Sequence, residues 1–90
     1  MRLRTGAGSR AHFELAEQDF REAIELAQKM SAKSLELRAT MSLARPLAKQ
    51  GRRDEARTML AAIYNWFTEG FDTADLRDAK ALLDELNSYN

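Results

Sequence analysis

Apolar residues recur three or four positions apart along four successive segments of the chain, and this spacing constrains the fold more than any other feature. The spacing places apolar side chains on one face of a helix, so each segment is predicted to form an amphipathic helix. Val is absent and Ile occurs only twice, whereas Ala, Leu, Glu, Arg and Lys are abundant, so a β-sheet is not expected. The predicted helices cover about residues 10–30, 34–50, 53–69 and 73–86.

The breaks between the segments predict where the helices end. Gly51 and Gly70 each follow a helical pattern, and glycine tolerates the left-handed backbone conformation that closes a helix. Residues 1–8 lack an apolar period and are predicted to be a flexible segment, which leaves a helical domain at residues 9–90. Pro46 lies inside the second pattern and is expected to bend that helix without ending it. Because the connections are short, successive helices should pack antiparallel.

The same patterns predict which side chains are buried. Met30 closes the apolar line of the first helix, Phe67 closes that of the third, and Glu36 of the second helix is expected to face solvent. The apolar line of the second helix comprises Leu35, Ala39, Leu43, Ala44 and Leu47.

Small residues recur with a fixed relation to larger ones, which is typical of paired helices that approach closely. The order is a small residue, a larger one four positions later and an apolar one three positions after that. It occurs at Ala16, Phe20 and Ala23, at Ala56, Leu60 and Ile63, and at Ala79, Leu83 and Leu86. With Leu43, Ala44, Leu47 and Gly51 upstream of Ala56, the pattern resembles a tetratricopeptide repeat.

The chain departs from that repeat in three ways. The period is forty residues where thirty-four is usual, Thr40 stands where an aromatic residue is expected, and the terminal Pro is missing. A generic antiparallel bundle would show similar spacings, so both architectures stay open on the pattern alone. The expected fold is all-α: four antiparallel helices in a right-handed, tetratricopeptide-like stack that the last helix caps.

Residues 32–86 resemble the extreme C-terminal end of large bacterial signalling proteins, and the run FTEGFDTADL, Phe67 to Leu76, is the most specific part. Those proteins join an adenylate or guanylate cyclase domain, or a winged-helix regulatory domain, to an ATPase module and a tetratricopeptide-like tail. The resemblance implies a helical interaction or scaffold module. It does not imply cyclase or ATPase activity, because no cyclase carboxylates can be placed and Gly6 to Ser9 lack the Lys of a phosphate loop.

Charge is distributed unevenly although the net charge is zero. Residues 33–57 carry seven basic and three acidic side chains, a balance of +4, and residues 69–90 carry two basic and six acidic ones, a balance of −4. In a tetratricopeptide pair the first helix lines a concave groove, and its positions carried over to this chain are Arg38, Met41, Arg45, Ala48 and Lys49. Three of the five are cationic, so the resemblance implies a groove that binds an acidic peptide.

Two other interpretations of the basic face stay open. It can be an ordinary solvated helix face, because exposed charge is what such faces usually carry. It can also contact the acidic last helix of the same or a second molecule, which would make the chain a structural cap or a homodimerisation module without a ligand of its own.

Four of the seven aromatic residues crowd into the segment before the last helix. Tyr64, Trp66, Phe67 and Phe71 are expected to pack in the core, because large aromatic side chains at helix junctions usually bury against neighbouring helices. Trp66 lies off the apolar line and is the candidate for an exposed contact. Asp72 or Thr73 is expected to cap the last helix.

Other functional classes find little support in the sequence. There is no Cys and His12 is the only His, so neither a metal site nor a cofactor is expected, and no set of catalytic groups proposes an enzyme. Arg52, Arg53 and Arg57 cluster at a helix start, but the pI is about 6.6 and the last helix is acidic, so nucleic acid is not an expected partner. The apolar runs are too short to span a bilayer, and a cytoplasmic protein is expected.

Overall fold

The part of the chain that the structure describes folds into four helices. The computed structural model describes the backbone of residues 5–88 and the side chains of residues 14–88. Within that part the helices are α1 (Thr5–Lys29), α2 (Lys33–Lys49), α3 (Arg53–Tyr64) and α4 (Ala74–Asn87), and no residue lies in a strand. The predicted all-α fold is confirmed. Helix α1 starts earlier than expected, because residues 5–8 of the predicted flexible segment belong to it, and residues 1–4 lie outside the described range.

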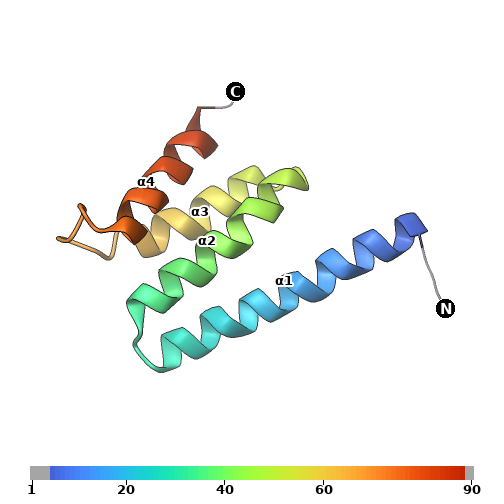
Figure 1. Cartoon of the computed structure of the whole chain (residues 1–90), viewed down its shortest axis with the longest axis horizontal. Coiled ribbons are helices and arrows are strands. Elements are labelled where there is room, and N and C mark those ends of the chain that lie inside the picture. Colours follow the sequence, from blue (N-terminus) through green and yellow to red (C-terminus); the bar gives the residue numbers. More distant parts are fainter. Residues whose placement is uncertain (1–4, 89–90) are drawn as a thin grey trace.

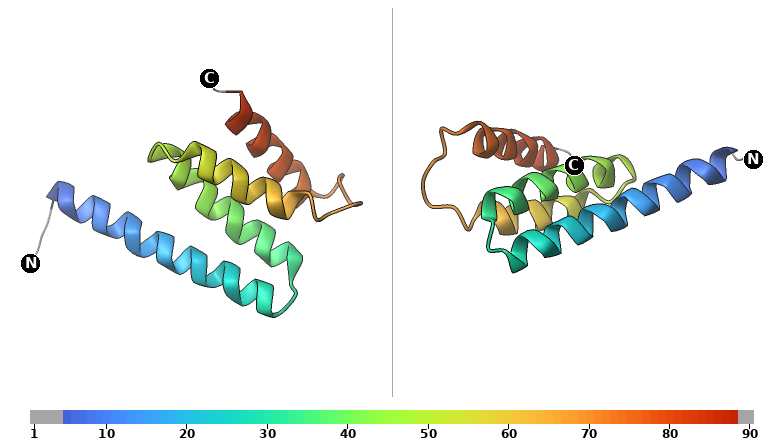
Figure 2. Two further views of the ribbon diagram at one scale, coloured as in Figure 1. Left: turned by 180° about the vertical axis from the view of Figure 1, so that it is seen from behind. Right: turned by 60° about the horizontal axis from the view of Figure 1, so that its bottom comes forward.

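Helix α2 lies at the centre of the arrangement. It runs antiparallel to α1 and to α3, and α4 packs against both α2 and α3 (Figure 1). Helices α1 and α3 both pack on α2 without close backbone contact between them, and the N-terminal part of α1 extends beyond the other three helices (Figure 2). The pair α2 and α3 with α4 against it therefore has the layout of a helical repeat followed by a capping helix.

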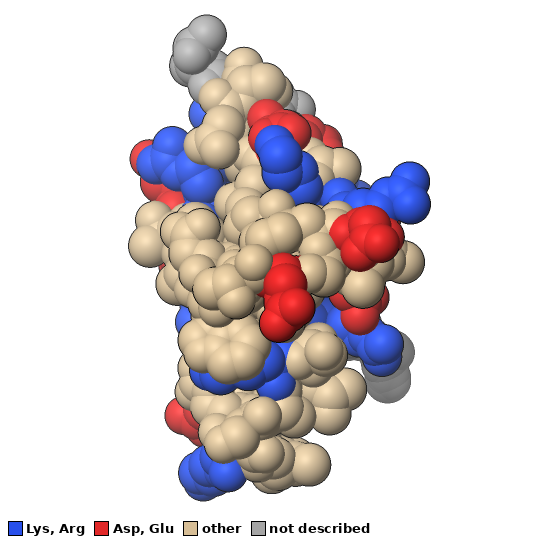
Figure 3. All heavy atoms as spheres, turned by 90° about the vertical axis from the view of Figure 1, so that its left-hand side faces the viewer, with Lys and Arg blue, Asp and Glu red and all other residues tan. Residues whose placement is uncertain are grey.

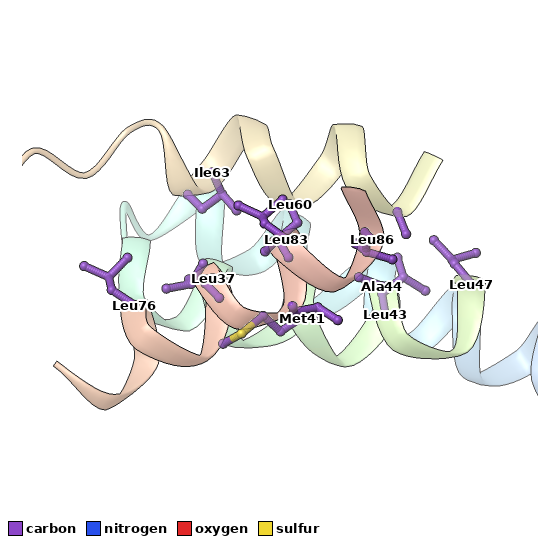
Figure 4. Packing of buried hydrophobic residues seen from close by; sticks show 13 residues of the cluster. Leu37, Met41, Leu43, Ala44, Leu47, Leu60, Ile63, Leu76, Leu83 and Leu86 are labelled. Atoms are coloured by element: carbon purple, nitrogen blue, oxygen red, sulfur yellow. The ribbon is translucent and has the colours of Figure 1, made fainter. Parts of the chain in front are cut away.

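The apolar core lies between α2, α3 and α4 (Figure 4). Its small positions Ala44, Ala56 and Ala79 are fully buried, and this lets the helix backbones approach each other closely. Two of the three predicted copies of the spacing, those beginning at Ala56 and Ala79, are thereby confirmed as core. The remaining core members are Leu37, Met41, Leu43, Leu47, Leu60, Ile63, Leu76, Leu82, Leu83 and Leu86.

Helix α1 packs against this core more lightly. Phe20 and Ile24 are half-buried, and Ala27 is the one fully buried apolar side chain among its described residues. The prediction was wrong at Ala23 and Met30, which are exposed. Both residues lie away from α2, and α2 is the only helix with which α1 makes close backbone contact.

The buried face of α2 also differs from the prediction. Leu35 is 48% exposed, whereas Leu37 and Met41 are buried and Glu36 is only 7% exposed. Glu36 was expected to face solvent, so that prediction was wrong. The reason is that α2 contacts α1, α3 and α4, which buries a wider arc of its surface than one apolar stripe covers and leaves Leu35 on the remaining face.

Helices α1 and α2 end in the same kind of turn. The N–H of Ala32 donates to the carbonyl of Ala27 at 2.8 Å, and the N–H of Arg52 donates to that of Leu47 at 2.9 Å. The left-handed residue is Gly51 in the second turn, as predicted, but it is Ser31, at φ 55°, in the first.

The last two helix boundaries differ in detail from the predictions. Helix α3 ends at Tyr64, so Phe67 and Gly70 lie in the connection that follows it. Thr73 occupies the N-cap position of α4, but its hydroxyl donates to the carbonyl of Gly70 at 2.7 Å and does not cap a free amide. Helix α2 continues through Pro46 to Lys49 and is not broken there.

Candidate functional site

Three of the five residues predicted to line a groove meet at one hollow. Arg45, Ala48 and Lys49, from the last turns of α2, face Leu82, Glu85 and Leu86 of α4 across a hollow of about 380 Å³, the α2–α4 hollow. Arg45 and Lys49 are exposed and form no ion pair with any residue that the structure describes. The hollow therefore combines an apolar floor with two available cations, opposed by one carboxylate from Glu85.

The other two predicted groove residues lie elsewhere. Arg38 donates from Nε to Oδ2 of Asp75 at 3.0 Å, which ties the first half of α2 to the start of α4. Met41 is 5% exposed and belongs to the core, because it lies one helical turn beyond the fully buried Leu37 on the face that α3 and α4 cover. Neither side chain lines the α2–α4 hollow.

The aromatic segment divides into two halves. Tyr64 and Phe67 are half-buried against the core, whereas Trp66 is 57% exposed and Phe71 is 45% exposed. The core role expected for all four rings was thus wrong for Trp66 and Phe71, which lie in the connection because α3 ends early. The rings of Tyr64 and Phe71 lie 5.7 Å apart at a hollow of about 520 Å³ that Arg77 and Lys80 also line. Trp66 was the candidate for an exposed contact; its side chain is exposed, and its contact role remains a prediction.

A second recess lies where α1, α2 and the end of α3 meet. Its volume is about 290 Å³, Glu36 and Thr40 of α2 lie buried along it, and Trp66 forms part of its rim. We call it the Trp66 recess. The sequence pattern missed it, because it depends on a buried carboxylate that periodicity places on the solvent side. The one available signal was the acidic residue in the first turn of α2 beside two apolar neighbours.

Four charged side chains tie α1 to the start of α3. Arg52 binds Glu17 with two bonds of 2.9 and 3.0 Å, and Arg52 and Arg21 both donate to Glu55. Arg21 also donates to Glu17, which closes the network. The hydrogen bonds from Arg52 hold the pKa of Glu17 below its ordinary value of 4.5, against the opposing effect of burial. Partial burial alone would raise the pKa of Glu55, yet the bonds from Arg21 and Arg52 lower it.

This network changes the interpretation of the arginine cluster at the start of α3. The guanidinium of Arg52 already bonds two carboxylates, and Arg57 pairs with Asp54 at 3.2 Å. A phosphate would have to compete with these bonds. The expected absence of a nucleic-acid partner stays a prediction.

The described part of the chain contains neither a group of metal-ligating side chains nor a membrane-spanning helix. No group of three or more His, Cys, Asp or Glu residues there could hold a metal ion. None of the helices described is both long and apolar enough to cross a membrane. The side chain of His12 lies outside the described residues.

Comparison with known proteins gives no match. No protein-family model matches the chain, and neither a curated protein nor a solved structure does. The resemblance of residues 32–86 to the tails of bacterial signalling proteins therefore remains a prediction from the sequence.

Proposed function

We propose that the chain is a non-catalytic protein-interaction module that binds an acidic peptide segment at the α2–α4 hollow. The observation that carries the proposal is the pair Arg45 and Lys49, two cations without an ion-pair partner in the described structure, beside an apolar floor made by Leu82 and Leu86. Arg can hold a carboxylate with two parallel bonds, and the apolar floor accepts the side chains that alternate with the acidic ones.

The parent protein that we propose is a cytoplasmic bacterial signalling or regulatory protein of the cyclase-type or ATPase-containing class. The support is the resemblance of residues 32–86 alone, with Phe67 to Leu76 as its most specific part. In this setting the module would serve as a scaffold in signal transduction and would require no cofactor.

The experiment measures binding of a fluorescein-labelled peptide that alternates Glu and Leu, by fluorescence anisotropy at low and high salt. The double variant Arg45→Glu, Lys49→Glu should weaken binding by about tenfold or more, because it converts attraction into repulsion. Arg77→Glu is the matched control, since it reverses an exposed cation of α4 that lies outside the α2–α4 hollow. Equal loss in the control and the double variant would reject the α2–α4 hollow as the site.

One observation favours a second candidate, a homodimerisation or capping module without a ligand. Leu15, Leu26 and Met30 are each close to 60% exposed, and their separations of about three turns and one turn place them on one face of α1. A second molecule could cover this face. Light scattering of the wild type and of Leu26→Lys tests the candidate: a dimer that the variant dissolves supports it, and a monomer at high concentration removes it.

A further inference from the structure

Glu36 is a buried carboxylate with hydrogen-bonding capacity to spare. Its residue is 7% exposed, Gln28 donates to Oε2 at 3.1 Å, and the ammonium of Lys33 lies 3.3 Å from Oε1. An ionised carboxylate has about four acceptor positions, so these two partners do not exhaust it. The remaining capacity lies at the Trp66 recess, which Glu36 lines.

The ammonium of Lys33 lies between two groups that both attract cations. It bonds Glu36 on one side, and on the other it lies 5.3 Å from the centroid of the Trp66 ring. The side chain of Lys33 is 32% exposed, and its bond to Glu36 spans a single helical turn. The ammonium can therefore reach water, but the buried carboxylate of Glu36 then needs another cation in its place.

Exposed apolar side chains also occur in the segments at this end of the molecule. Met30 is 59% exposed, Leu35 48%, Trp66 57% and Phe71 45%. These residues come from the α1–α2 turn, the first turn of α2 and the α3–α4 connection, which share one end of the molecule (Figure 1). Seen from that end, most of the surface is uncharged, with separate acidic and basic side chains scattered over it (Figure 3). The recess, with the exposed ring of Trp66 at its rim, thus lies at an end of the molecule where apolar side chains are exposed.

We infer that the Trp66 recess accepts a lysine or arginine side chain from a partner protein, which takes the position of Lys33 between Glu36 and Trp66. The exchange replaces one cation by another, so Glu36 remains neutralised in the free and in the bound state. An apolar residue beside the incoming cation packs on the exposed ring of Trp66. This partner is basic and apolar, in contrast to the acidic peptide proposed for the α2–α4 hollow, and the two surfaces share no residue.

Trp66 supplies the reporter, because it is the only Trp in the chain. Its fluorescence is followed while the peptide acetyl-Leu-Arg-Leu-amide is added, with acetyl-Leu-Glu-Leu-amide as the matched probe of opposite charge. The inference predicts saturable binding of the Arg peptide and at least about tenfold weaker binding of the Glu peptide. Equal binding of both peptides would show an apolar surface without a cation site and would overturn the inference.

Two variants separate an exchangeable lysine from a purely structural one. Lys33→Met removes the internal competitor and should tighten binding of the Arg peptide by about threefold or more. Glu36→Gln keeps an acceptor for Gln28 but removes the charge and should weaken it by about tenfold. Glu69→Gln, at an exposed acid of the α3–α4 connection, is the control and should leave affinity unchanged. Unchanged affinity of Lys33→Met for the Arg peptide, or no binding of that peptide by the wild type and by Lys33→Met, would overturn the inference. Far-UV circular dichroism tests whether each variant folds. If Glu36→Gln does not fold, the comparison of Lys33→Met with the wild type still tests the inference.

Discussion

Replacing Leu60 by Ala tests whether the core between α2, α3 and α4 is packed as described. The side chain of Leu60 is fully buried and lies in the layer of leucines that joins the three helices (Figure 4). The substitution removes three carbon atoms, and the lost transfer free energy is about 2.4 kcal/mol at about 0.8 kcal/mol for each. The cavity left behind adds to this, so the free energy of unfolding should fall by about 3 to 4 kcal/mol.

That loss is large for a chain of this length. Ninety residues at about 0.05 to 0.15 kcal/mol each give a total stability of about 5 to 13 kcal/mol. Urea denaturation followed by circular dichroism at helical wavelengths measures the change, and the midpoint should fall while the slope with urea stays constant. Leu15→Ala makes the same chemical change at a site that is 60% exposed, and it should alter stability by less than about 0.5 kcal/mol. A loss of less than about 1 kcal/mol in Leu60→Ala, or equal losses in the two variants, would refute the packing.

Two further predictions concern the ends of α1 and its charged network. Ser31→Gly should raise the free energy of unfolding by about 0.5 to 1 kcal/mol in urea denaturation, because glycine adopts φ 55° without strain. The control Ser34→Gly, inside α2, should lower the free energy of unfolding by about 0.5 kcal/mol. A loss of stability in Ser31→Gly would contradict the reasoning. Hydrogen bonds from Arg52 lower the pKa of Glu17 in the folded state, so their stabilisation is fully present above the unfolded pKa near 4.5 and is lost as pH falls through the folded value. The urea midpoint of the wild type should therefore decrease as the pH is lowered from about 5 to about 3. Glu17→Gln should show a smaller decrease over the same range. An equal decrease in the variant would show that other carboxylates cause the pH dependence.

Most of the core of the last three helices could be predicted from the sequence because most of its positions obey a local rule, Leu37 and Met41 of α2 being the exceptions. Ala56, Leu60 and Ile63 follow one another at spacings that put them on one helical face, and that face is buried in the structure. The rule fails at Leu35 and Glu36. The exposure of Leu35 and the burial of Glu36 depend on how many helices surround α2. That number is a property of the assembled fold, and the local spacing of apolar residues does not reveal it.

The charged network and the Trp66 recess escaped prediction for a related reason. Glu17 with Arg21 and Arg52 with Glu55 are both visible in the sequence as pairs one helical turn apart. The sequence contains no sign that the two pairs face each other, because Glu17 and Arg52 are far apart along the chain. Of the residues expected to line a groove, Arg45, Ala48 and Lys49 line a hollow, whereas Met41 belongs to the core; binding at that hollow stays a prediction.

The two candidate surfaces are built by different helices, so they should differ in how easily local unfolding disrupts them. The α2–α4 hollow is built by helices that share the core, so it persists as long as that core does. The Trp66 recess needs Ile24 and Gln28 of α1, a helix whose described residues bury only Ala27 fully among apolar side chains. Helix α1 should therefore open at lower free energy than the rest of the domain. Opening removes Gln28 from Glu36 and dismantles the recess, whereas the α2–α4 hollow, which contains no residue of α1, keeps its lining.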